Sequence, residues 1–116
     1  MREIRRDAIH PGVELTGKQR RYLRGLGHSL QAVIQLGKGG IDEGVVRALD
    51  AALLQHELVK VRLSAEVPEG RDDAAAALAE KTRSAIAQIL GRTILLYRRH
   101  PKEPKIVFPR DAASGS

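Results

Sequence analysis

The stretch Ala-Val-Ile-Gln-Leu-Gly-Lys-Gly-Gly-Ile-Asp-Glu, residues 32–43, decides the fold of this chain. It begins with a short apolar run, residues 32–36, whose length and flanking glycines predict a buried strand. After the glycines, apolar residues recur with helical periodicity over residues 42–56, at positions 45, 46, 49, 52 and 53. Because Asp42 and Glu43 favour the first turn of a helix, the stretch predicts a strand, a tight turn and a helix.

The turn itself, Gly37-Lys38-Gly39-Gly40, is a candidate site for an anion. Glycine has no Cβ, so its backbone can adopt a positive φ and approach a ligand closely. The first N–H groups of the following helix lack intrahelical partners, and Lys38 adds a full positive charge beside them. These features predict that the turn binds a phosphate group. The alternative interpretation is a tight connection that requires glycine and binds nothing.

The nucleotide-binding motifs that use similar glycines are excluded by the neighbouring residues. A P-loop ending at Lys38 requires a glycine where the chain has Ala32, and a serine or threonine where it has Gly39. The dinucleotide fingerprint requires a third glycine where the chain has Asp42. We therefore expect the phosphate to belong to a polymer.

The charge distribution also indicates a polyanionic partner. The chain has 116 residues, which suits one domain, and a formal net charge of +6. Residues 1–38 carry eight Lys and Arg against three acids, and residues 91–116 carry six against two. The intervening residues 39–90 carry six Lys and Arg and nine acids. If the two ends meet in the fold, they form one positive face, as polyanion binding requires. The alternative is an ordinary solvated surface that happens to be basic.

Composition excludes several other classes. The chain has no cysteine, so disulfides and thiolate zinc sites are excluded, and a reducing cytoplasm is expected. No apolar stretch approaches the ~18 residues of a membrane span. The start of the chain has no apolar block typical of a secretory signal. Aromatic residues make up only 3% of the chain, so we expect contacts to phosphates and to shape instead of base stacking on a sheet.

A first helix is predicted over residues 17–30. Thr16 is its candidate cap, and Tyr22, Leu23, Leu26 and Leu30 form its apolar stripe. Gly25 and Gly27 weaken the later turns and could end the helix early. The rest of its circumference carries four cations with no carboxylate between them, an unusual pattern for a solvated helix: Lys18, Arg20, Arg21 and Arg24.

The second half of the chain continues the alternation of strands and helices. Residues 58–66 alternate apolar and polar side chains, which predicts a half-buried strand with Lys60 and Arg62 on its open side. Further elements are predicted as a helix over 72–88, a covered central strand over 93–98 and an edge strand over 106–108. The order α-β-α-β-α-β-β predicts an α/β fold, a small four-stranded sheet covered by helices.

The expected organisation is a flexible basic arm over residues 1–14, one domain over 15–108 and a disordered tail over 109–116. No catalytic or metal-binding set is apparent. His56 and Glu57 resemble the start of a zinc-protease helix, but Lys60 stands where the second histidine belongs. We therefore expect no enzymatic activity, no metal and no cofactor.

Several segments together resemble the CRM domain (chloroplast RNA splicing and ribosome maturation), which in bacteria stands alone as the YhbY-type protein. They follow one another in the expected order over about residues 15–98. The matching segments are Leu15-Thr16-Gly17-Lys18-Gln19-Arg20-Arg21-Tyr22-Leu23-Arg24, His28, Gly37-Lys38-Gly39-Gly40, Ala52-Leu53, His56-Glu57-Leu58-Val59-Lys60-Val61, Gly91-Arg92 and Leu96-Tyr97-Arg98. Two positions depart from the family pattern: Ala32 replaces a usual proline, and Gly27 replaces a common alanine. We expect these changes to loosen the corner between helix and strand.

The resemblance implies a mixed-sheet α/β RNA-binding domain similar to the C-terminal domain of initiation factor three. The glycine turn sits in that domain much as the phosphate-clamping loop sits in a KH domain. Bacterial members are associated with precursors of the large ribosomal subunit and are thought to assist its assembly without acting as enzymes. The resemblance does not extend over residues 1–14 or 99–116.

These lines together predict a cytoplasmic, monomeric protein that binds structured ribosomal RNA. Gly37, Lys38, Gly39 and Gly40 would hold a phosphate, and Lys18, Arg20, Arg21 and Arg24 would extend the contact. Candidates of second rank are Lys60, Arg62, Arg92 and Arg98. The alternatives are a DNA-binding module, which a short glycine-interrupted helix does not favour, and a factor that docks on a ribosomal protein.

Overall fold

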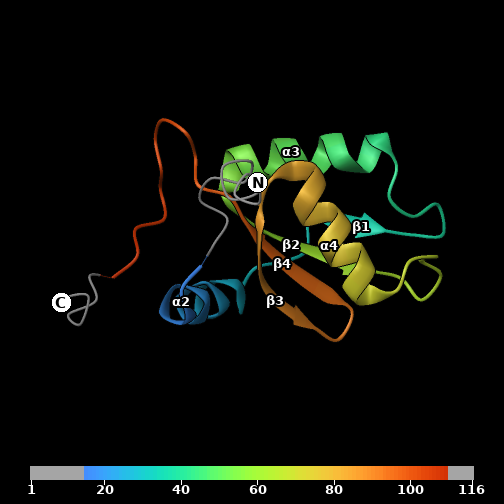
Figure 1. Ribbon diagram of the computed structural model, residues 1–116, viewed down its shortest axis with the longest axis horizontal. Helices are drawn as coiled ribbons and strands as arrows, with labels where there is room; N and C mark the ends of the chain where they lie inside the picture. The colour runs from blue at the N-terminus through green and yellow to red at the C-terminus, as the bar shows by residue number, and fades with distance from the viewer. Residues whose placement is uncertain (1–14, 110–116) are drawn as a thin grey trace, which may run out of the picture.

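The computed structural model describes residues 15–109 (Figure 1). The arm expected over 1–14, and all but the first residue of the tail expected over 109–116, lie outside the described residues. Three helices and four strands alternate along the described chain. In order they are α2 (Gly17–Gly27), β1 (Ile34–Leu36), α3 (Glu43–His56), β2 (Leu58–Leu63), α4 (Arg71–Thr82), β3 (Ala85–Leu90) and β4 (Thr93–Tyr97).

The four strands form one mixed sheet in the order β1-β2-β4-β3. β1 runs parallel to β2, with Ile34 opposite Val61, and the other neighbouring strands are antiparallel. Helices α3 and α4 cover one face of the sheet, and α2 lies on the other face (Figure 1). The predicted α/β class and the mixed four-stranded sheet are therefore confirmed.

The larger core lies between the sheet and helices α3 and α4. Leu49 and Leu53 from α3 and Leu78 from α4 are fully buried there against alternate residues of the central strands. The strand residues of this core are Leu36, Val59, Val61, Leu63, Ile94 and Leu96. The predicted central position of the strand near residues 93–98 is confirmed, because β4 has a neighbour on each side.

The smaller core lies under α2. Leu23 of α2 is fully buried against Leu95 and Tyr97 of β4, among others. Gly27 lets α2 approach β4 closely, since a Cβ at this position would lie 2.6 Å from Leu95 Cδ2. Gly27, where the family commonly has alanine, thus permits close packing here, and the loosening expected at this corner stays a prediction. As Thr16 predicted, the helix begins with a cap: Gln19 N–H donates to Thr16 Oγ1 over 3.0 Å.

Two predicted elements are wrong. The helix expected over 72–88 ends at Thr82, and Ala85–Leu90 form β3 instead. Arg83 adopts a left-handed conformation at φ 57° and terminates the helix, a role that glycine normally plays. At the same turn, Thr82 Oγ1 donates to Leu78 O over 2.7 Å, so this carbonyl near the end of the helix has a hydrogen-bond partner.

The edge strand expected over 106–108 is not a strand. Its Ile106 N–H donates to Glu57 Oε1 over 2.7 Å, so this amide bonds a carboxylate and not a neighbouring strand. Ile106 and Phe108 pack against the smaller core. Boundaries elsewhere are shorter than predicted: the first helix ends at Gly27, the first strand spans 34–36, and the second strand ends at Leu63.

Candidate nucleic-acid interface

The glycine turn forms a closed loop at the end of β1. Gly40 N–H donates to Gly37 O over 2.9 Å, and Gly40 has a φ of +69°, which favours glycine. Gly37 and Gly39 face open space, because a Cβ at either position would have no other atom within 4 Å. Within residues 15–109, the N–H groups of Lys38 and Gly39 make no backbone hydrogen bond, and the Lys38 side chain is exposed. The loop therefore offers free donors and room for a ligand.

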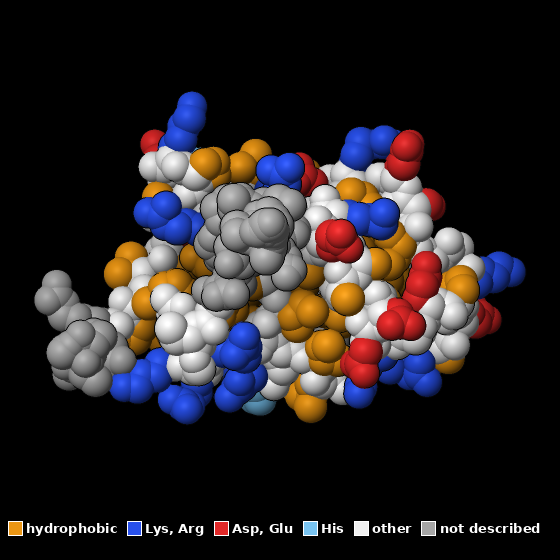
Figure 2. All heavy atoms as spheres, viewed as in Figure 1, with side chains coloured by type: hydrophobic (Ala, Val, Ile, Leu, Met, Phe, Trp, Pro, Cys, Tyr) orange, Lys and Arg blue, Asp and Glu red, His pale blue; other side chains and the backbone are white. Residues whose placement is uncertain are grey.

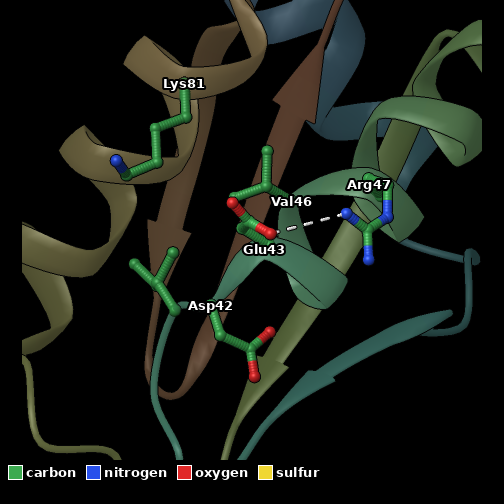
Figure 3. Close-up of a pocket in the computed structure, with 6 residues that line it drawn as sticks. Asp42, Glu43, Val46, Arg47 and Lys81 are labelled. Carbon is green, nitrogen blue, oxygen red and sulfur yellow. Dashed lines mark ion pairs between the residues drawn. The ribbon is translucent and has the colours of Figure 1, made fainter.

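The first turn of α3 is less open to an anion than the sequence suggested. Asp42 is the cap of α3, and its Oδ1 accepts a hydrogen bond from Val45 N–H over 2.8 Å. Glu43 lies beside it and pairs with Arg47 over 3.7 Å (Figure 3). A cavity of about 590 Å³ lies here, and Lys81 of α4 lines its opposite wall. A phosphate at this point would meet two carboxylates, which leaves Lys38 and the loop amides as the better donors.

A third carboxylate lies against the loop from the other side. A Cβ on Gly40 would lie 2.9 Å from Glu69 Oε1, which is buried and lacks a hydrogen-bond partner among the described residues. No sequence pattern indicates this neighbour. Glu69 lies in a Pro-Glu-Gly turn distant in sequence, and only the packing of that turn brings it to the loop. Its negative charge weakens the positive potential around Gly40.

Two strand cations share the face of the sheet on which α2 lies. Side chains alternate along β2: Val59 and Val61 enter the core under α3 and α4, while Leu58 enters the core under α2. Lys60 and Arg62 therefore point to the α2 side. Arg62 is exposed and Lys60 is half-buried. The predicted display of both cations on the open side of the strand is confirmed.

Arg92 lies at the same end of the sheet as the glycine loop. Leu63 N–H donates to Arg92 O over 2.8 Å, and Ser64 N–H donates to Leu36 O over 2.9 Å. These bonds place the end of β1, the end of β2 and the turn before β4 side by side. We call this the loop end of the sheet. Lys38, Arg92 and Arg62 thus lie at or next to one end.

The cations of α2 divide by helical position. Tyr22 lies on one flank, with its ring 5.8 Å from that of Phe108, which also contacts Tyr97 at the end of β4 away from the loop. Arg20 and Arg24, one turn apart, lie on the opposite flank of the helix, away from Tyr22 and Phe108. Arg21 and Lys18 lie on the outer surface of the helix and are exposed.

Figure 2 shows Lys and Arg side chains gathered over α2, whereas acidic side chains gather over α4 and the turn before it. We use the term basic face for the cations on the α2 side and at the loop end: Lys18, Arg20, Arg21, Arg24, Lys38, Lys60, Arg62 and Arg92. They come from four separate segments of the chain, which the fold brings to the α2 side or to the loop end of the sheet.

Arg98 does not belong to this surface. Its guanidinium donates to Asp50 Oδ1 over 2.6 Å and to Thr82 O over 2.8 Å, on the side of α3 and α4. It also lies at the end of β4 away from the loop. The structure therefore separates Arg98 from the other candidates and gives it partners that link α3 and α4.

Glu57 is the second acidic residue whose role the sequence did not reveal. It is 1% exposed, yet its carboxylate accepts hydrogen bonds from three backbone N–H groups of the segment after β4. The donors are His100, Lys105 and Ile106, at 2.7, 2.8 and 2.7 Å. Burial raises the pKa of Glu57, but these hydrogen bonds and the nearby His100 outweigh it and hold the pKa below its ordinary value. We call residues 99–108 the strap.

Neither a metal cluster nor a membrane-spanning helix is found in the described part of the chain. In residues 15–109, no three His, Cys, Asp or Glu side chains cluster as metal ligands would. None of the helices in the same residues has the length and apolar character to cross a membrane.

Comparisons with known proteins agree with the fold. Residues 15–98 match the CRS1/YhbY (CRM) domain model. The "Probable RNA-binding protein YqeI" of Bacillus subtilis is 38% identical, over 82% of this chain and 99% of its own length. An "RNA-binding protein" of Haemophilus influenzae is 38% identical, over 83% of this chain and 96% of its own length. The solution structure of SAV1595 from Staphylococcus aureus, for which RNA binding has been proposed, superposes with a TM-score of 0.71 at 38% identity, over 83% of this chain and all of that one. The chain belongs to the CRS1/YhbY (CRM) domain family.

Proposed function

We propose that this protein binds RNA through the basic face. The observation that carries the proposal is the position of Lys38, Arg62 and Arg92 at or next to the loop end of the sheet, with Lys60 and Arg62 on the face that α2 covers. The named relatives, described as RNA-binding proteins, support the same class of ligand. Binding is expected to be without catalysis.

The contact is made mainly to the phosphate backbone. The free N–H groups of Lys38 and Gly39 belong to a loop without Cβ atoms at positions 37, 39 and 40, so a phosphate oxygen can approach the backbone closely. Lys38 supplies a positive charge, which the negative charges of the neighbouring Asp42 and Glu69 partly offset. Phosphate contacts fix the position of the nucleic acid and carry little sequence information.

The proposed target is structured ribosomal RNA in precursors of the large subunit, bound by a monomer in the cytoplasm. This part of the proposal rests on the family, whose bacterial members are associated with such particles. A face formed by a helix, a strand and two turns suits a folded RNA better than an extended single strand, because its cations point from several directions.

Sedimentation of a cell lysate through a sucrose gradient tests the proposal. The test variant combines Lys38→Ala, Arg21→Ala and Arg24→Ala. The matched control removes three exposed cations elsewhere, with Lys81→Ala, Arg99→Ala and Lys102→Ala. We expect wild type and control in the fractions of large-subunit precursors and the test variant at the top of the gradient.

Two results would contradict the proposal. If all three proteins remain at the top, the ribosomal target is wrong. If all three sediment with the particle, and still do so after nuclease treatment, the protein docks on another protein and the basic face is not the interface.

A further inference from the structure

An apolar groove opens between the end of α2 and the start of β1, on the same side of the sheet as the basic face. It has a volume of about 420 Å³. Leu26, Leu30 and Val33 line it and are 38%, 37% and 58% exposed, although each is large and aliphatic. Three polar side chains also line it: Gln31, His56 and Lys60. The groove is thus an apolar site with a few hydrogen-bonding groups, a composition typical of ligand sites.

The strap completes one wall of the groove. Ile106 lines it, and the Ile106 N–H is held by Glu57 Oε1 over 2.7 Å. The neighbouring Lys105 N–H donates to the same oxygen over 2.8 Å, so the wall is fixed by two hydrogen bonds to one buried carboxylate. This wall lies beyond residue 98, where the match to the family model ends. The groove is therefore completed by a segment that the family match does not include.

The groove is continuous with the basic face through Lys60. Lys60 lines the groove, and Arg62, two residues further along β2, points to the same side toward the loop end. A nucleic acid whose backbone contacts Arg62 and the loop would therefore pass beside the groove. The groove volume lies within the ~300–1,000 Å³ usual for small-ligand sites, which leaves room for a planar base.

We propose that the groove binds one unpaired base of the RNA whose backbone lies on the basic face. The proposal rests on the proposed function. Leu26, Leu30 and Val33 would contact the face of the base, so aliphatic side chains would replace the aromatic platform that this chain lacks. Gln31 offers both a donor and an acceptor to the edge of the base, and Lys60 offers donors only.

Two substitutions remove apolar groove contacts without changing charge: Leu30→Ala and Val33→Gln. Each has a control of the same chemistry at an exposed residue outside the groove. Leu54→Ala lies on α3, where the leucine is 47% exposed, and Val107→Gln lies on the strap, where the valine is 75% exposed. Because all four side chains are partly or largely exposed, we expect the variants to fold.

The experiment compares two RNAs by fluorescence anisotropy over a range of salt concentrations. One is a stem-loop with an unpaired loop, and the other is the same stem-loop with its loop nucleotides lacking their bases. We expect wild type to prefer the complete loop by about tenfold. Leu30→Ala and Val33→Gln should each lose most of that preference, while both controls keep it. The salt dependence should be the same for all five proteins, since the phosphate contacts are unchanged.

Equal binding of wild type to the two RNAs, with normal salt dependence, would overturn the base site and leave RNA binding intact. A loss in Leu54→Ala as large as in Leu30→Ala would also overturn it. Salt-independent or undetectable binding to both RNAs would remove the proposed function and this inference together. If sedimentation without RNA shows a wild-type dimer that Val33→Gln dissociates, the occupant is a second copy and the proposal is wrong.

Discussion

Arg98 and Asp50 form an ion pair that joins the end of β4 to α3, with Arg98 Nη1 2.6 Å from Asp50 Oδ1. The Arg98 side chain is only 21% exposed, and its second nitrogen donates to Asp50 O over 3.0 Å. By contrast, Arg92 precedes β4 and is exposed at the loop end of the sheet. The two arginines flank one strand, yet Arg98 is paired and largely buried whereas Arg92 is exposed to solvent.

Replacing these arginines should therefore separate stability from RNA binding. Arg98→Ala should lower the free energy of unfolding by about 1–2 kcal/mol, because three hydrogen bonds to Asp50 and Thr82 are lost at a partly exposed site. Arg92→Ala should leave stability unchanged and weaken RNA binding. Urea unfolding and anisotropy titration of both variants check this. If Arg92→Ala lowered the stability and Arg98→Ala left it unchanged but weakened RNA binding, the assignment would be contradicted.

Two adjacent glycines should behave differently when replaced by alanine. Gly40→Ala should destabilise the fold by about 1–2 kcal/mol, because its φ of +69° disfavours a Cβ that would also meet Glu69. Gly39→Ala should leave the melting temperature unchanged, since the added Cβ would have no other atom within 4 Å. The same Cβ should weaken RNA binding by obstructing the approach of a phosphate. Thermal unfolding and RNA titration test both. Full RNA affinity in Gly39→Ala would show that the loop backbone is not a contact.

The carboxylate beside the loop should oppose RNA binding. Glu69→Gln removes that charge at the Gly40 side of the loop, and we expect RNA affinity to rise about two- to fivefold at low salt. Glu80→Gln on α4, equal in charge and exposed, is the control and should have no effect. If Glu69→Gln binds RNA more weakly than wild type, Glu69 supports the loop and does not oppose the ligand.

Acid should release the strap. The folded pKa of Glu57 lies below its unfolded value, ~4.3, so the ionised carboxylate stabilises the fold above that pH and loses this contribution as pH falls through the folded pKa. Glu57→Gln should lower the free energy of unfolding by about 1–3 kcal/mol at neutral pH. In acid, the free energies of unfolding of the variant and of wild type should become more similar. Trypsin should also cleave the variant faster after Arg99 and Lys105. A stability difference that is independent of pH would contradict this role.

The sequence predicted the parts of the fold that depend on local pattern. The periodicity over residues 42–56 predicted α3, and the alternation over 58–66 predicted β2 although the strand ends at Leu63, because each element packs one face against the larger core. The glycines after Leu36 placed the loop. These features need no knowledge of distant residues.

The errors arose where distant contacts override local preference. The alanine-rich run that forms α4 continues into Ala85 and Ile86 with a spacing that suits a helix or a strand, and a left-handed Arg83 in place of glycine hides the boundary. The strap is held by Glu57, which lies 43 to 49 residues away from its donors. No sequence spacing reveals such a pair. For the same reason, the bonds of Arg98 to Asp50 and Thr82, 48 and 16 residues away, could not be predicted from the sequence.

The salt dependence of RNA binding tests the central claim most directly. If about six phosphates contact the basic face, the logarithm of affinity should fall against the logarithm of salt concentration with a slope of roughly −4 to −5. The variant with Lys38→Ala, Arg21→Ala and Arg24→Ala should show a slope about 2–3 smaller in magnitude, and the control with Lys81→Ala, Arg99→Ala and Lys102→Ala should match wild type. A flat salt response in wild type, or equal slopes in the two triple variants, would contradict binding of RNA by the basic face.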